Sequence, residues 1–173
     1  MEVVFRRHED NGRRACSWEA TRAKRTRVPG PYMAVGRDLP HDLGQYVVEA
    51  ATGYRLGFWG LLEQGATYRS TGRRRTQPGR AVIAEHRSEL DASEELAGLH
   101  LAAWKRGDDT AVTRALDAAM AQWRGLGDGG AIAFTWPSPH GEVTDPGRPI
   151  YRGRSTGDAG GTGTDRSRAA PSP

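Results

Sequence analysis

The chain of 173 residues has few of the features that build disulfide-linked, zinc-binding or membrane proteins. Cys16 is its only cysteine, so neither an intramolecular disulfide nor a cysteine-rich zinc module can form. No stretch approaches the roughly 18 consecutive apolar residues of a membrane-spanning helix. Residues 1–7 carry charge and lack the apolar run of a secretory signal. We therefore expect a cytoplasmic protein that does not enter a membrane.

Lysine and hydrophobic residues are also scarce. Only Lys24 and Lys105 are lysines among 25 basic residues, a bias that a GC-rich genome explains as well as arginine chemistry does. Hydrophobic residues make up 36% of the chain and are concentrated before Pro137, after which Gly, Pro, Ser, Thr and Arg dominate. This distribution predicts one globular domain over residues 1–137 and a disordered Gly/Pro/Arg-rich tail over residues 138–173.

The local patterns predict an α+β fold. Two apolar runs, Glu2–Arg6 and Ala15–Ala20, flank Asn11-Gly12, a pair typical of hairpin turns. A strand near 131–136 should join this hairpin in a small antiparallel sheet, and residues 21–37 should form a loop or an irregular strand. About four helices should pack against the sheet.

The helices are expected from apolar spacing and from residues that favour helix ends. Asp38 should cap the first helix, Asp91 or Ser93 a later one, and Asp109 or Thr110 the last, which Gly125 should end. The helices are expected at residues 38–52, 81–90, 91–106 and 109–125, and residues 58–62 should form a short helix or a turn packed on the first helix. The expected core contains Val4, Phe5, Trp18, Leu43, Val47, Phe58, Trp59, Leu99, Leu116, Met120, Trp123 and Phe134.

A polar stripe on the first helix is the strongest candidate site. His41, Gln45 and Glu49 are spaced four residues apart, with Asp42 beside them, so they share one side of a helix. The favoured interpretation is a solvated outer face, because a helical projection puts the stripe roughly opposite the apolar side; Val48 within it hints at partial cover. The alternative is a metal or acid–base site, for which the helix dipole should lower the pKa of His41 and keep its imidazole neutral.

The stripe departs from the zinc-protease pattern His-Glu-x-x-His. Asp42 stands where that pattern has glutamate, and Gln45 stands where it has the second histidine. A neutral amide oxygen is a weak zinc ligand. We therefore predict no metal and no cofactor.

The run Leu-Pro-His-Asp-Leu-x-x-Tyr-Val-Val-Glu over residues 39–49, with a closing Phe-Thr-Trp-Pro over residues 134–137, resembles a family of uncharacterised actinobacterial proteins. The resemblance covers residues 1–137. Many members of that family have a second histidine where this chain has Gln45. The resemblance implies no activity, and the departure at Gln45 argues further against a metal site.

The remaining nucleophiles and possible ligands are weaker candidates. His86 shares a predicted helix with Glu85 and Glu89, and His100 lies near the apolar side of another. Each is best explained as a surface or packed residue, although a ligand set of His41 and Glu49 with either histidine stays open. Cys16 has no recognisable base nearby and should be a small packed residue.

Two basic runs in predicted loops, residues 22–27 and Arg73-Arg74-Arg75, are the other functional candidates. Both lie in the basic part of the chain, since residues 1–80 carry 15 Lys and Arg against 8 Asp and Glu. They suit phosphate contacts, and the following aromatic residues would supply stacking surfaces: Trp18, Tyr32 and Tyr68. The competing interpretation is a charged, solvated loop.

Three functions remain open from sequence. The leading hypothesis is a small non-enzymatic protein that binds an unknown protein partner through the His41 helix or the basic loops. The second is a metal-dependent hydrolase-like enzyme, or its degenerate descendant, with His41 and Glu49 as site residues. The third is an accessory nucleic-acid binder that uses the arginine loops.

Overall fold

The computed structural model describes residues 1–72 and 74–137; the predicted tail and Arg73 lie outside them. Five strands form one antiparallel sheet in the order β3-β2-β1-β5, and β4 also pairs with β2. The strands are β1 (Glu2–Asp10), β2 (Arg13–Arg22), β3 (Thr26–Pro29), β4 (Met33–Ala34) and β5 (Ala131–Thr135). The α+β prediction is confirmed, with a larger sheet than the hairpin and closing strand alone.

The hairpin between β1 and β2 follows from its turn. Asn11 and Gly12 have φ values of 50° and 72°, the left-handed conformation that a two-residue hairpin turn requires. The pairing runs from Glu2 opposite Thr21 to Asp10 opposite Arg13. A short 3-10 turn, η1 (Ala23–Arg25), then leads into β3.

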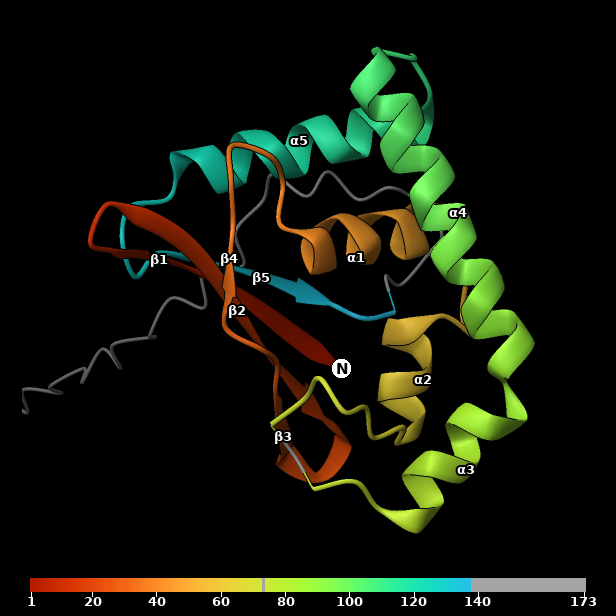
Figure 1. The fold of residues 1–173 in the computed structure, drawn as a ribbon. Helices are drawn as coiled ribbons and strands as arrows, with labels where there is room; N and C mark the ends of the chain where they lie inside the picture. Colours follow the sequence, from red (N-terminus) through yellow and green to blue (C-terminus); the bar gives the residue numbers. More distant parts are fainter. Residues whose placement is uncertain (73, 138–173) are drawn as a thin grey trace, which may run out of the picture.

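Five helices gather on one side of the sheet (Figure 1). They are α1 (His41–Thr52), α2 (Phe58–Gln64), α3 (Gln77–Glu85), α4 (Arg87–Arg106) and α5 (Ala111–Gly125). Helix α1 packs against both α4 and α5. Within the described residues, no helix is both long and apolar enough to cross a membrane.

Several predicted helix starts were wrong. Pro40, not Asp38, occupies the N-cap of α1. Helix α3 begins earlier than predicted, because the Thr76 hydroxyl accepts a hydrogen bond from the Gly79 amide at 3.1 Å. Helix α4 begins directly after His86, so Asp91 and Ser93 lie inside it and cap nothing.

The cap of the last helix was predicted correctly. Thr110 lies at the N-cap of α5, and its hydroxyl accepts from the Thr113 amide at 3.1 Å. The helix then runs to Gly125, where the sequence predicted its end.

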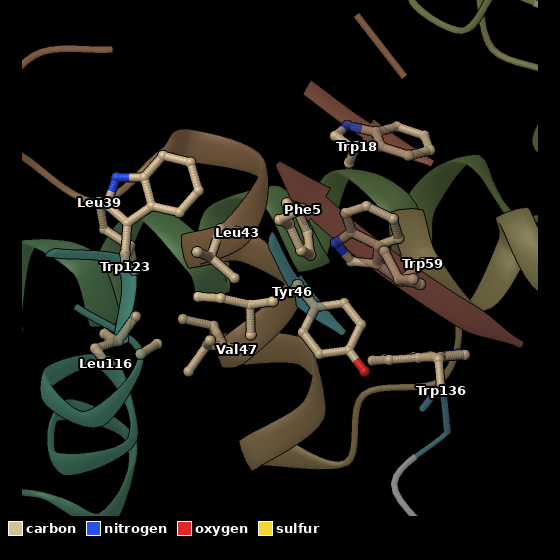
Figure 2. Close-up of a cluster of buried hydrophobic side chains, with 14 of the residues drawn as sticks. Phe5, Trp18, Leu39, Leu43, Tyr46, Val47, Trp59, Leu116, Trp123 and Trp136 are labelled. Atoms are coloured by element: carbon tan, nitrogen blue, oxygen red, sulfur yellow. The ribbon is translucent and has the colours of Figure 1, made fainter. Parts of the chain in front are cut away.

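The core lies between the sheet and the helices. Aromatic rings fill its centre: the rings of Phe5 and Trp59 lie 5.5 Å apart, and those of Tyr46 and Trp59 lie 5.4 Å apart, both edge to face (Figure 2). Eight predicted core residues are buried: Phe5, Trp18, Leu43, Val47, Trp59, Leu116, Met120 and Trp123.

The other core predictions need correction. Val3, rather than Val4, is buried with Phe5, because adjacent strand residues point to opposite faces. Leu99 is 62% exposed, since α4 turns other positions inward. Phe58 and Phe134 are only partly buried at the margin of the core.

Candidate functional site

The polar stripe of α1 divides into an exposed first turn and a buried remainder. His41 is exposed, whereas Gln45 is 3% and Glu49 is 1% exposed. The predicted solvated face was therefore wrong for these two residues, because α4 and the start of α2 cover that side of α1. Val48 is fully buried, so the prediction from this residue that other elements partly cover this side of α1 was correct.

The Glu49 carboxylate receives four hydrogen bonds. Its Oε1 accepts from the Phe58 amide at 2.9 Å, from Ser93 Oγ at 3.0 Å and from Gln45 Nε2 at 3.2 Å. Its Oε2 accepts from the Trp59 amide at 3.0 Å. We call these four donors and the carboxylate the Glu49 network.

The Glu49 network caps helix α2 from a distance. The first amides of any helix lack partners within the helix, and α2 has Gly57 at its N-cap with no side chain to satisfy them. Glu49 supplies this cap from α1 and brings a negative charge to the positive end of the helix. It therefore fixes how α2 docks against α1.

Gly57 makes this docking possible because it leaves room for the carboxylate. A Cβ at position 57 would lie 2.3 Å from Ser93 Oγ and 2.5 Å from Glu49 Cδ. No side chain fits there without moving α2 or the network. Ser93 belongs to the site as a donor, a role that the sequence reading did not assign to it.

Burial controls the charge on Glu49. It raises the pKa of the Glu49 carboxyl from 4.5 to about 7, and the four donors oppose this rise without cancelling it. The carboxyl thus titrates near neutral pH inside the protein. All four partners donate to it, an arrangement that suits the ionised form.

Gln45 connects the Glu49 network to the surface. Its Nε2 donates to Glu49 and also to Glu94 Oε1 at 3.3 Å. Glu94 lies on α4 and is exposed. The amide therefore occupies the space between two carboxylates and lessens their mutual repulsion.

The first turn of α1 forms a separate chain of contacts. His41 Nδ1 lies 3.2 Å from Asp42 Oδ1, and Trp18 Nε1 donates to Asp42 Oδ2 at 2.7 Å. The hydrogen bond with Asp42 raises the pKa of His41, so the lowered pKa predicted from the helix dipole was wrong. A neighbouring carboxylate outweighs a partial charge at the helix end.

The other candidate ligands do not assemble. Among residues 1–72 and 74–137, no group of three or more His, Cys, Asp or Glu side chains lies close enough together to hold a metal ion. His86 contacts Glu89 at 3.6 Å on its own helix turn. The ligand set of His41 and Glu49 with His86 or His100 is therefore not formed by the described residues.

Cys16 is buried under the helices, as predicted for a packed residue. Burial raises the pKa of its thiol to about 12. The nucleophilic thiolate is therefore strongly disfavoured near neutral pH.

The loops that carry the two basic runs lie side by side. The Gly72 amide donates to the Pro29 carbonyl at 2.9 Å, which holds the loop that ends at Gly72 against the end of β3. Figure 1 shows this loop beside β3 and η1 at the end of the molecule where α3 begins. We define the basic surface as Lys24, Arg25, Arg69, Arg74 and Arg75, all of which are exposed.

The cations of the basic surface have no acidic partner among the residues that the structure describes. In the described part of the chain, no carboxylate forms an ion pair with any of these five side chains, whereas Arg27 beside them pairs with Glu19 at 3.1 Å. Arg73 lies outside the described residues. Sequence reasoning found both runs but treated them separately, since only tertiary contacts join them.

The predicted stacking surfaces are mostly unavailable. Trp18 is 3% exposed. Tyr68 is half-buried, and its ring stacks on Phe58 with centroids 4.4 Å apart. Tyr32 is 60% exposed but lies beside His8, with ring centroids 5.0 Å apart.

Comparison with known proteins adds no relative. No protein-family model matches the chain, and neither the curated proteins nor the solved structures contain a significant match.

Proposed function

We propose that this is a non-enzymatic protein that binds the phosphate backbone of nucleic acid through the basic surface. One observation carries the proposal: the Gly72–Pro29 hydrogen bond holds together two loops that are more than 40 residues apart in sequence and that carry the five cations of the basic surface. Within the described residues, none of these five side chains forms an ion pair with a carboxylate. Clustered cations bind polyanions by releasing condensed counterions. Guanidinium groups also match the geometry of phosphate oxygens.

The proposed contacts are to phosphate and do not read sequence. The aromatic residues that would stack on bases are buried, half-buried or placed against His8. Phosphate contacts set affinity and position without discriminating bases. Binding should therefore depend strongly on salt and weakly on sequence.

The Glu49 network supports a non-enzymatic interpretation. A carboxyl that titrates near pH 7 is a natural candidate for acid–base chemistry. Here it is 1% exposed, and both of its oxygens are occupied by donors from α1, α2 and α4. We assign it to holding α2 in place.

Fluorescence anisotropy with labelled DNA of about 20 nucleotides, single-stranded and duplex, tests the proposal. Affinity should fall steeply between about 50 and 200 mM salt. Replacing two cations, in Arg74→Ser/Arg75→Ser, should reduce the slope of log K against log salt by about 2. Lys24→Asn/Arg25→Asn should do the same, and asparagine tolerates the positive φ of both positions.

A matched control lies at the far end of the molecule. Arg106→Ser/Arg114→Ser removes the same charge from side chains that pair with Asp108 and Asp109. This variant should keep the salt slope of the original protein. A flat salt dependence, or an equal loss of affinity in the control, would reject the basic surface as the binding site.

A further inference from the structure

Strand β5 forms an open edge of the sheet. It pairs with β1 on one side, and no other described strand pairs with its outer side. The opposite edge of the sheet is β3, where the basic surface lies. The two edges are therefore available for different contacts.

The outward backbone groups of β5 follow from its register. Trp136 donates its amide to the Met1 carbonyl at 2.7 Å, and Arg7 donates to the Gly130 carbonyl at 2.8 Å. Since bonding direction alternates along an antiparallel strand, Ala131, Ala133 and Thr135 turn their amides and carbonyls outward. Among the described residues, only one of these outward groups has a hydrogen-bond partner: the Thr135 carbonyl accepts from the Tyr46 hydroxyl at 3.2 Å.

This edge carries none of the usual protection against pairing. Residues 131–135, Ala-Ile-Ala-Phe-Thr, include no charge and no proline. Ala131, Ala133 and Thr135 are all exposed. Unprotected edge strands are templates for pairing with another strand.

We propose that β5 pairs antiparallel with β5 of a second copy of this chain, around a two-fold axis at Ala133. Ala133 then faces Ala133 of the second copy, and Ala131 faces Thr135 of the second copy. Every outward amide meets an outward carbonyl in this register. The Thr135 carbonyl has two lone pairs, so it can accept from Ala131 of the second copy as well as from Tyr46. The two sheets join into one, and both basic surfaces stay at its outer ends.

The side chains fit this register on the core face. Ile132 lies opposite Phe134 of the second copy there, and the reverse contact follows from the two-fold axis. Phe134 is only partly buried in the single chain. The contact with the second copy therefore covers apolar surface that the single chain leaves exposed.

Charge complementarity also favours a second copy, on the face of the sheet that points away from the core. Arg6 lies beside Ala131, and Glu2 lies beside Thr135. The proposed register therefore aligns Arg6 with Glu2 of the second copy, three strand spacings or about 14 Å away between Cα atoms. The Ala and Thr residues between them are small, so the two long side chains can meet above them. Arg6 already reaches to the β5 side of β1, where its Nη1 donates to the Gly129 carbonyl at 2.9 Å.

Sedimentation equilibrium of the full chain, up to about 1 mM protein, tests this arrangement. The protein should form dimers, and Ala133→Pro should be monomeric because it removes the two central amide donors of the interface. Arg6→Glu and Glu2→Arg should each weaken the dimer at least about tenfold, whereas the double variant Arg6→Glu/Glu2→Arg should restore it. Arg14→Glu, the same charge change on β2 away from the edge, should leave the dimer intact.

A protein that stays monomeric at every concentration, or a dimer that Ala133→Pro does not weaken, would overturn the proposal. Failure of the charge swap to restore the dimer would overturn the proposed register. A monomer whose Ala133 amide is protected from hydrogen exchange would show that residues 138–173, rather than a second copy, cover the edge.

Discussion

The two ends of the stripe on α1 lie in different surroundings. His41 and Asp42 form a hydrogen-bonded pair at the surface, and Gln45 and Glu49 form another pair within the protein. Both pairs look equally polar in the sequence. At the exposed end, water solvates each charge whether or not the pair forms, whereas at the buried end the four donors replace water entirely. Hydrogen-bonded polar pairs on one side of the same helix therefore contribute little to stability at one end and much at the other.

The largest effect is expected at the buried end. Glu49→Ala leaves the Phe58 and Trp59 amides and the Ser93 hydroxyl without their acceptor in a site closed to water. We expect the free energy of unfolding to fall by about 3–5 kcal/mol in urea denaturation. Glu95→Ala, an exposed glutamate on α4, is the control and should change stability by less than about 0.5 kcal/mol. Similar losses in the two variants would remove the distinction between buried and exposed carboxylates.

The pH dependence of stability should come next in size. The pKa of Glu49 in the folded protein, about 7, exceeds its ordinary value of 4.5, so the folded state binds this proton more tightly. The resulting stabilisation is complete below pH 4.5 and is lost as pH rises through 7. Relative to Glu49→Gln, which cannot titrate, the protein should lose on the order of 3 kcal/mol between pH 4.5 and pH 8. Parallel curves for the two proteins would show that burial does not raise this pKa.

The smallest effect is expected at the exposed end. His41→Ala should lower the free energy of unfolding by less than about 1 kcal/mol, because the side chain is mostly in water. Since Asp42 raises the pKa of His41, this small contribution should be present below pH 6.5 and should fade as pH rises above it.

Asp42→Ala should cost more, about 1–3 kcal/mol, because it leaves the buried Trp18 Nε1 without an acceptor. Thermal denaturation of both variants at pH 5 and pH 8 checks which of them loses more stability. A larger loss in His41→Ala than in Asp42→Ala would contradict it.

Sequence reasoning succeeded where the determining contacts are local. Asn11-Gly12 specified the hairpin through its turn conformation, and Thr110 specified the start of α5 through a hydrogen bond three residues away. The apolar spacing of Leu43, Tyr46 and Val47 likewise located α1. Each of these signals acts within a few residues, so a single sequence displays it.

The same reasoning failed where the burial of a residue depends on a second helix that packs over it. A helical projection of α1 identifies one apolar side but cannot show that α4 and α2 cover another. Val48 was the single residue whose position signalled that cover. The core prediction of Leu99 failed for a related reason, since the sequence does not show which side of α4 meets α1.

The sequence by itself therefore determined the α+β class, the hairpin and the helical character of most segments, because turn chemistry and apolar periodicity act over a few residues. Only the tertiary structure decided that Glu49 caps α2 across Gly57 and that the loop carrying Lys24 and Arg25 lies beside the one carrying Arg69, Arg74 and Arg75. Both arrangements depend on contacts between segments far apart in the chain. No local pattern encodes which distant donor a buried carboxylate meets or which loops come together.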